Sequence, residues 1–381
     1  MEVYEDLLNW ARGQDIELHG IEPRPLSGRG IGVVSTKSIK ENEVLLRVPT
    51  SALRTAKTVC KKVSSKLPTG SRVHGLLAAD IILNPSPKYK QWNAVMPSRE
   101  DVWASLPLTW NRRLHELLPR SARERLRKQE TKFERDWTAI KQAFPDSKIS
   151  RNDYLYAWAL VNTRTFYYEL NGNSKLHKDD RLALQPVADL LNHHDSEGCK
   201  VDFESDDCTI TSTRAYAPGD EVYICYGNHG NDFLLAEYGF VLPQNRWDEV
   251  CLDDAILPKL SARQKEQLDE VGFLGNYMLD SNGVCYRTQV ALRLICLPLN
   301  EWRRFVDGEA GAGGGDAERQ QQEEVDRKLV HLLRKYQDMI RNTVERIKDS
   351  EVGQPCQRDL LCLRWTQIQS LMEKTIEKLD V

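Results

Sequence analysis

Short β-like runs lie on both sides of a long stretch with a helical pattern, and this arrangement constrains the fold more than any other feature. Residues 27–49 (SGRGIGVVSTKSIKENEVLLRVP) contain two such runs, and residues 186–226 contain three more. Between them, from about residue 52 to 180, apolar side chains recur at helical spacing. The sequence therefore predicts an α+β fold, with a β-rich core, a long helical insertion and an all-helical C-terminal domain.

The predicted domain boundary follows residue 245. Residues 1–245 form the β-rich domain, including the insertion at about 52–180, and residues 246–381 form the C-terminal domain. Two amphipathic stretches near the C-terminus are short and interrupted, so we expect two helices packed against each other rather than a coiled coil. These stretches are 329–347 and 365–379.

Glycine shapes the start of the first β-like segment. Gly28, Gly30 and Gly32 fall within five residues and prevent a helix there. Apolar runs at 33–34 and 44–48 follow, separated by a polar turn. We therefore expect a glycine-rich turn that leads into a hairpin formed by these two runs.

Two serines in the helical stretch carry the spacing of helix caps. Ser121 precedes Glu124 by three residues, and Ser150 precedes Asp153 in the same way. Reciprocal bonds between such side chains and the backbone satisfy amide donors at a helix start. The sequence therefore predicts a helix beginning at each serine.

Composition excludes several classes of protein. The formal net charge is -3 at pH 7, and nucleic-acid or membrane binders usually need a basic surface. We therefore expect no direct nucleic-acid or membrane partner. No apolar stretch approaches 18 residues, and the N-terminus lacks the apolar segment of a signal peptide. The nine cysteines are then expected to be reduced thiols in a cytoplasmic or nuclear protein.

Two polar segments are candidates for binding. The glycine turn at 28–32 lacks the following helix of a dinucleotide fingerprint, so a tight turn is favoured, whose bare backbone lets a flat cofactor approach. Residues 189–195 (DLLNHHD) could form a metal site through His193, His194 and Asp195. Adjacent histidines in an extended chain point in opposite directions, however, so a hydrogen-bonded turn is favoured and no metal is expected.

A third candidate segment, 224–240, contains two Tyr-Gly pairs. Cys225 near His229 could suggest a thiol nucleophile, but no oxyanion-binding arrangement is readable. Taken singly, Tyr226 and Tyr238 are better explained as core aromatic residues.

Taken together and in order, the segments SGRGIGVVSTKSIKENEVLLRVP, VNTRTF, PVADLLNHH and ICYGNHGNDFLLAEYGF resemble those of the SET-domain methyltransferases. The subgroup typified by the plant Rubisco large-subunit methyltransferase, with fungal and animal members, is most similar. The resemblance runs from about residue 5 to 245, and the helical insertion and helical C-terminal domain also fit this subgroup. It implies methyl transfer from S-adenosyl-L-methionine to a lysine of another protein.

The resemblance also implies roles for individual residues. The turn at Arg29, Gly30 and Ile31 matches the backbone that approaches the cofactor, and Arg164 matches the arginine that pairs with its methionine carboxylate. Asn192 and His193 match the Asn-His pair that contacts the cofactor. Asp189 begins the same segment and is included among the cofactor-binding residues.

Both Tyr-Gly pairs have counterparts in the family. Tyr226 matches the catalytic tyrosine, while Tyr238 and Phe240 match the segment that closes the cofactor and lysine site, with Tyr238 also catalytic. All three are therefore expected at the cofactor. A lysine must lose its proton, which has a free pKa of about 10.4, before it attacks a sulfonium methyl group. An apolar, aromatic channel lowers that pKa by desolvation, and tyrosine oxygens then orient the amine.

Differences from the wider family restrict the class of protein substrate that we expect. The Cys-x-Cys-x4-Cys zinc segment of many histone-directed SET domains is absent, which favours a non-histone protein. Proteins of the translation machinery are among the substrates of related fungal enzymes. Two alternatives remain: a catalytically silent SET-fold scaffold, and a methyltransferase for histidine or an N-terminal amine. Tyr238 is replaced in an animal relative that modifies histidine, so its presence here favours lysine. Nothing in the sequence explains His194.

Overall fold

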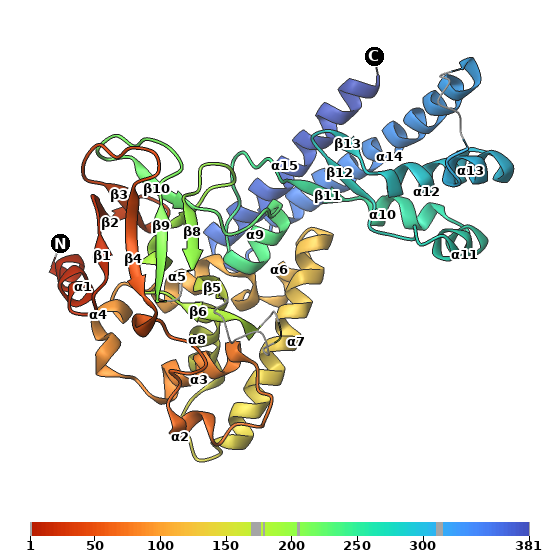
Figure 1. Ribbon diagram of the computed structural model, residues 1–381. Helices are drawn as coiled ribbons and strands as arrows, with labels where there is room; N and C mark the ends of the chain where they lie inside the picture. The colour runs from red at the N-terminus through yellow and green to blue at the C-terminus, as the bar shows by residue number, and fades with distance from the viewer. Residues whose placement is uncertain (1, 169–176, 178–179, 204–205, 310–314, 381) are drawn as a thin grey trace. The chain divides into compact units, whose positions relative to one another are not determined.

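The computed structural model describes residues 2–168, 177, 180–203, 206–309 and 315–380 (Figure 1). The chain divides into two compact units, and it passes between them within helix α5, within helix α7 and between His229 and Gly230. The first unit comprises Met1–Trp103 and Arg127–His229, and the second comprises Ala104–Leu126 and Gly230–Val381.

Strands dominate the middle of the first unit, and helices lie before and between them. Its helices and 3-10 turns are α1 (Glu2–Arg12), η1 (Thr50–Ala52), α2 (Lys61–Ser64), α3 (Val73–Leu83), η2 (Pro87–Tyr89), α4 (Lys90–Asn93), α5 (Arg99–Ser105), α7 (Arg120–Ala143), α8 (Arg151–Arg164) and η5 (Ala188–Leu190). Its strands are β1 (Glu17–Leu18), β2 (Ile21–Leu26), β3 (Gly30–Ser35), β4 (Val44–Pro49), β5 (Thr165–Tyr167), β6 (Leu182–Leu184), β7 (Asn192–His193), β8 (Lys200–Phe203), β9 (Asp207–Thr211) and β10 (Glu221–Ile224).

Two four-stranded sheets combine strands from both sides of the helical insertion. One has the order β1-β4-β9-β8 and the other the order β2-β3-β10-β7, and β5 pairs with β6 alone. Strand β4 is antiparallel to β9, and β3 is antiparallel to β10. The predicted α+β core with a helical insertion is thus confirmed.

The predicted hairpin between 33–34 and 44–48 is wrong. Strands β3 and β4 lie in different sheets, and the glycine turn instead joins β2 to β3, where Leu26 pairs with Gly30. Strand β2 contains two prolines, and all its pairing is with β3, so it lies at the edge of its sheet.

The two predicted helix caps have different outcomes. Helix α8 begins behind a capping box in which Ser150 and Asp153 bond reciprocally to the backbone. Helix α7 begins at Arg120, so Ser121 lies inside its first turn, and Glu124 pairs with Arg120 at 2.9 Å instead of capping. The cap predicted at Ser121 is therefore wrong.

Aromatic packing forms the core of the insertion. Trp158 of α8 is fully buried, and its ring stacks on His74 of α3 at a centroid distance of 4.1 Å. Phe133 of α7 meets the same indole edge-on at 5.8 Å, and the Trp158 indole donates to Asp136. These contacts fix α8, whose last residue is Arg164.

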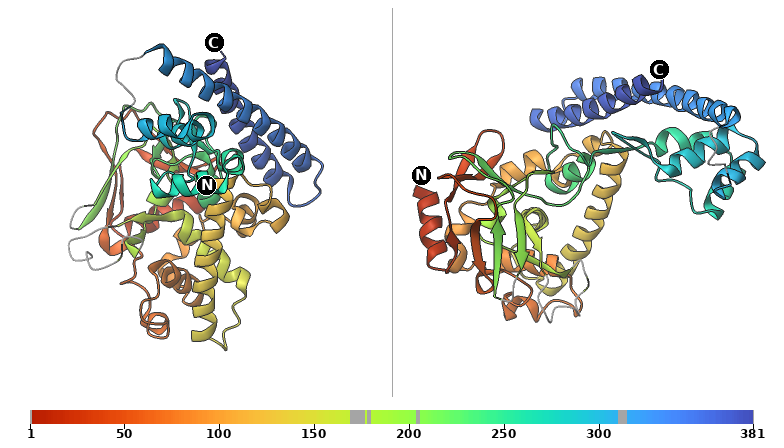
Figure 2. Two further views of the ribbon diagram at one scale, coloured as in Figure 1. Left: turned by 90° about the vertical axis from the view of Figure 1, so that its right-hand side faces the viewer. Right: turned by 45° about the horizontal axis from the view of Figure 1, so that its top comes forward.

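The second unit is mainly helical. Figure 2 shows its two longest helices, α14 and α15, side by side, as the sequence predicts. The region also contains a three-stranded sheet, β11-β12-β13, which the prediction of an all-helical domain did not include. Its elements are η3 (Pro107–Thr109), α6 (Arg112–His115), α9 (Asn231–Tyr238), β11 (Glu249–Cys251), α10 (Asp253–Ile256), η6 (Leu257–Lys259), α11 (Ala262–Glu270), β12 (Met278–Asp280), β13 (Gly283–Val284), α12 (Tyr286–Cys296), α13 (Leu299–Val306), α14 (Asp316–Lys348) and α15 (Pro355–Leu379).

None of the helices in the described part of the chain has both the length and the apolar character needed to cross a bilayer.

Candidate active site

One sheet of the first unit brings three predicted site segments together. The turn at Gly30 opens β3, β3 pairs with β10, and β10 pairs in parallel with β7, opposing Tyr223 to Asn192 and Ile224 to His193. Tyr226 follows the end of β10 by two residues. Strand β3 also packs against η5, which carries Asp189. The sheet thus brings segments that are far apart in the sequence next to one another.

The glycine turn presents bare backbone to solvent. Gly28 and Gly30 have φ angles of +71° and +70°, a region that favours glycine. Apart from the glycine itself and its two chain neighbours, no atom of the described residues lies within 4 Å of where each Cβ would be. At Gly32 the opposite holds, because a Cβ would lie 2.9 Å from the Asn192 amide nitrogen. The turn therefore leaves open space at Gly28 and Gly30 and is tightly packed at Gly32.

Glu221 organises this side of the site, although sequence reasoning did not identify it. Its carboxylate, only 8% exposed, pairs with Arg29 at 2.7 Å and accepts hydrogen bonds from Asn192 at 2.8 Å and Tyr223 at 2.9 Å. The Tyr223 hydroxyl also accepts from Arg29, and this bond, together with Glu221, raises the pKa of the guanidinium. Glu221 thereby fixes the side chains of Arg29 and Asn192 relative to each other.

Arg164 is held by the backbone and carboxylate of Asp189. Its Nη1 donates to the Asp189 carbonyl oxygen at 2.7 Å and lies 3.6 Å from the carboxylate. The Trp92 indole donates to both carboxylate oxygens at 3.2 Å. Burial raises the pKa of Asp189 to about 6 despite these partners. Asp189 is thus placed to orient Arg164 from behind.

We expect Asp189→Asn to change how stability depends on pH. Because the folded-state pKa of about 6 exceeds the ordinary value of 3.8, the ionised form is penalised on folding, and that penalty grows as pH rises through this window. The wild type should lose roughly 3 kcal/mol more unfolding free energy than the variant between about pH 3 and pH 7.5. Urea denaturation at several pH values measures this difference. A difference that does not vary with pH would contradict the burial argument.

His193 and Tyr226 contact each other directly. The backbone N–H of Tyr226 donates to His193 Nδ1 at 3.0 Å, and the two rings stack at 5.1 Å. Burial lowers the pKa of His193 to about 4, so the ring is neutral near pH 7. The Tyr226 hydroxyl donates to the carbonyl of Leu191 at 2.8 Å. That bond turns the lone pairs of the oxygen away from Leu191.

The structure gives His194 a local role. Its Nδ1 accepts backbone N–H bonds from Ser196 at 3.2 Å and Glu197 at 3.0 Å, which stabilises the turn after β7. His193 therefore accepts a hydrogen bond from Tyr226, whereas His194 accepts hydrogen bonds from the turn after β7. Across the described residues, no group of three or more His, Cys, Asp or Glu side chains is arranged to hold a metal ion.

Tyr238 and Phe240 belong to the second unit. Tyr238 ends α9, and its ring lies 6.4 Å from that of Phe233 and 6.2 Å from that of Phe240. Gly239 between them adopts φ +79° and caps the helix in the left-handed conformation. The two rings thus form one aromatic cluster on either side of a sharp turn.

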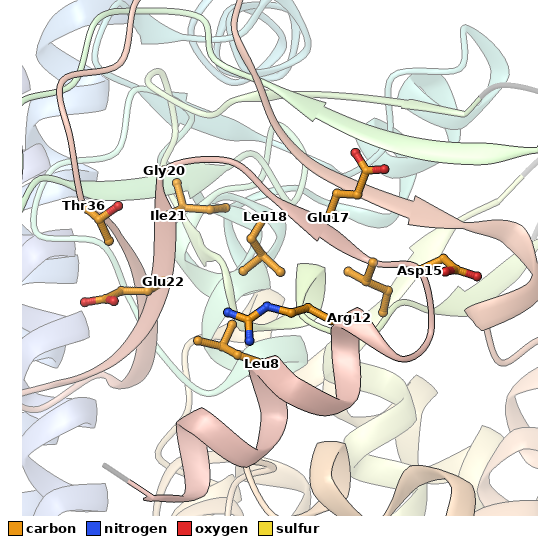
Figure 3. A pocket seen from close by; sticks show the side chains of 10 residues that line it. Leu8, Arg12, Asp15, Glu17, Leu18, Gly20, Ile21, Glu22 and Thr36 are labelled. Atoms are coloured by element: carbon orange, nitrogen blue, oxygen red, sulfur yellow. The ribbon is translucent and has the colours of Figure 1, made fainter.

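A separate hollow of about 520 Å³ lies beside α1, β1 and β2 (Figure 3). It is lined by charged side chains such as Arg12, Glu17 and Glu22, and by none of the predicted site residues. It is therefore not the candidate site.

The SET domain family matches residues 30–227, which is more than half of the chain. This chain belongs to the SET-domain family. The family described as the ribosomal lysine N-methyltransferase 2 C-terminal domain matches residues 248–378. The predicted activity, that of a protein-lysine N-methyltransferase dependent on S-adenosylmethionine, is thereby confirmed.

Curated relatives extend over nearly the whole chain. Ribosomal lysine N-methyltransferase set11 of Schizosaccharomyces pombe is 26% identical, and the match covers 98% of both chains. SET domain-containing protein 4 of Homo sapiens is 24% identical over 98% of this chain and 90% of its own length. Actin-histidine N-methyltransferase of Danio rerio is 23% identical over 81% of this chain and 55% of its own length.

Solved structures show the same fold. The structure of Rubisco LSMT bound to AdoMet matches 99% of this chain and 93% of its own, with a TM-score of 0.64 and 17% identity. That of the LSMT SET domain bound to lysine and AdoHcy matches with a TM-score of 0.63 and 16% identity. The predicted Rubisco methyltransferase-like fold is confirmed.

The geometry of the first unit fits S-adenosylmethionine. The cofactor carries a carboxylate, and the buried Nε of Arg164 has no hydrogen-bond partner among the described residues. The Gly28–Gly30 turn leaves open space beside its backbone. Arg164 therefore retains a donor for a carboxylate, and the turn retains room for a ligand.

Proposed function

We propose that this enzyme methylates a lysine of a ribosomal protein. The support is similarity along nearly its full length to ribosomal lysine N-methyltransferase set11, and the match of its C-terminal part to the corresponding domain of ribosomal lysine N-methyltransferase 2. We place the enzyme in the cytoplasm or nucleus, where such proteins are made and assembled.

The observation that carries the catalytic proposal is the sheet register around β10. It supports a site in which Arg29, Gly30 and Ile31, together with Asn192 and His193, surround the approach to Tyr226. Arg164, held by Asp189, is assigned to the carboxylate of the cofactor. Tyr238 and Phe240 are assigned to closure of the cofactor and lysine site, as the family resemblance implies.

S-adenosylmethionine, when bound, supplies a methyl group activated by a sulfonium. The residues of the chain act on the lysine. Aromatic side chains desolvate its ammonium and lower its pKa, which favours the neutral amine. The oxygen of Tyr226, whose hydrogen is directed to the Leu191 carbonyl, offers lone pairs that orient the amine and stabilise the partly positive methyl group.

We assign residues 246–381 to substrate recognition and keep the domain boundary after residue 245 as part of this proposal. The two family matches leave residues 228–247 between them. The helices α14 and α15 provide long surfaces on which a folded protein substrate can be bound.

Histidine methylation is the second candidate, because actin-histidine N-methyltransferases are among the relatives. The presence of Tyr238 favours lysine over this alternative. A silent scaffold is disfavoured because Arg164, Asn192, Tyr226 and Tyr238 are all present.

We expect the purified chain to transfer radiolabelled methyl groups from S-adenosylmethionine to one or a few ribosomal proteins. The substrate should be ribosomal protein from cells that lack the enzyme, because a lysine that is already fully methylated cannot accept a labelled methyl group. Mass spectrometry should place the label on lysine. Label on histidine would support the second candidate, and no transfer by folded, cofactor-binding protein would support the scaffold.

A further inference from the structure

Arg364 of α15 is a buried charge shared between two carboxylates of the second unit. Its residue is 0% exposed, its Nε lies 2.6 Å from Asp232, and its Nη1 lies 2.7 Å from Asp248. Its Nη2 also donates to the carbonyl of Glu249 at 3.3 Å. Asp232 is in the first turn of α9, so the guanidinium joins the C-terminal helix to the start of α9.

Gln367, one turn after Arg364, contacts both ends of the same segment. Its amide nitrogen donates to the carbonyl of Leu242 at 2.8 Å, and its amide oxygen accepts from Asn231 at 3.0 Å. Asn231 and Leu242 are in turn joined by two hydrogen bonds of 3.0 Å. Residues 231–242 therefore form a closed loop that α15 holds at its base.

Tyr238 lies near the far end of this loop. A Cβ on Gly239 would lie 2.7 Å from the carbonyl oxygen of Ser105, so the turn after Tyr238 packs directly on neighbouring backbone. Arg125 pairs with Glu237 at 3.2 Å and lies 4.0 Å above the ring of Phe233. The loop is thus fixed at its base by α15 and along its length by residues 104–126.

We propose that Arg364, assisted by Gln367, positions Tyr238 for methyl transfer. The C-terminal helix then contributes to catalysis through the placement of Tyr238 within the second unit, in addition to any part it has in recognising the substrate. This inference rests on the proposed function, since it assigns Tyr238 to the lysine site.

The groups that meet at the start of the 231–242 loop explain why residue 364 is an arginine. Two carboxylates and a carbonyl require donors pointing in three directions, which the planar guanidinium supplies and a lysine ammonium does not reproduce. A buried ion pair whose hydrogen bonds are all made specifies one geometry. Loss of the Arg364 guanidinium leaves the carboxylates of Asp232 and Asp248 without this partner. The loop should then move by an amount that matters for catalysis, because misplacement of about 1 Å can cost about 100-fold in rate.

The test uses the full chain carrying Arg364→Lys and a short lysine peptide from the identified substrate, which makes few contacts outside the catalytic site. We expect kcat and kcat/KM to fall together by roughly 10- to 100-fold, with cofactor affinity nearly unchanged. Hydrogen exchange should rise at residues 231–242 and remain unchanged in β3 and β10. If Arg364→Lys does not fold, the milder Gln367→Leu is subjected to the same measurements.

Met372→Ala is the matched control. Met372 is also fully buried on α15, and its truncation destabilises the helix without removing a bond to α9. Its kcat should stay within about twofold of wild type at a temperature where it is folded. An equal loss of kcat in this control, unchanged exchange at 231–242 in Arg364→Lys, or raised exchange with an unaltered kcat would each overturn the inference.

A Tyr238→Phe variant separates this inference from the proposed function. A normal rate in Tyr238→Phe removes Tyr238 from catalysis and overturns both its assignment and the inference. If the wild type methylates no lysine, the proposed function fails, and the exchange result still decides whether Arg364 holds the loop.

Discussion

Tyr226→Phe should lower the rate of methyl transfer by at least about 100-fold while leaving the protein folded. The change removes one oxygen, and the loss of one preorganised polar group at a reacting centre has an effect of this size. The ring should keep its stacking on His193, and the backbone bond to His193 Nδ1 does not involve the hydroxyl.

The cost to stability should be small, because the hydrogen bond to Leu191 that is lost is worth about 1 kcal/mol. Single-turnover kinetics and thermal unfolding of the same preparation measure the two effects. Tyr216→Phe is a suitable control, since its buried hydroxyl bonds to Cys199 and not to a predicted site residue. A Tyr226 variant with lowered stability and a normal rate would identify Tyr226 as a packing residue.

Arg164→Gln should weaken binding of S-adenosylmethionine by roughly 10- to 100-fold, since a hydrogen bond to a charged group contributes about 1.5–3 kcal/mol. Calorimetric titration gives the affinity directly. The increase in melting temperature caused by the cofactor should shrink accordingly, because a ligand specific to the folded state stabilises in proportion to its occupancy.

Arg214→Gln provides a control for the loss of an arginine in the same unit. Arg214 pairs with Glu197 at 3.1 Å and lies over the ring of Tyr216. Its variant should bind the cofactor like the wild type. Unaltered affinity in Arg164→Gln would remove Arg164 from the carboxylate site and leave it the structural role of bracing Asp189.

Features set by local sequence were predictable. The helical insertion and the pair α14 and α15 follow from apolar periodicity, which a short window of sequence contains. The cap at Ser150 was also predictable, whereas the identical spacing at Ser121 failed because α7 starts two residues before the first residue that Ser121 would cap, and Glu124 pairs with Arg120. Cap patterns predict that a helix starts nearby better than they predict its first residue.

Features set by distant contacts were not predictable from pattern alone. Alternation marks a strand but does not name its partner, so β3 and β4 were wrongly paired. Glu221 and Arg364 have ordinary sequence surroundings, and their importance appears only in contacts with Arg29 and Asp232, remote in the chain. The predicted site residues came from family resemblance, which carries information about distant contacts that this single sequence lacks.

The division of the sheets by the helical insertion also governs how the chain is made. Strand β4 ends at Pro49 and its partner β9 starts at Asp207, so roughly 160 residues separate them. At the usual rate of synthesis, on the order of 10 s or more passes between the emergence of the two strands. During this interval the edge of β4 is open to incorrect pairing. We therefore expect the helical insertion, whose contacts are more local, to fold first, and the two sheets to close only after the strands beyond it have been synthesised.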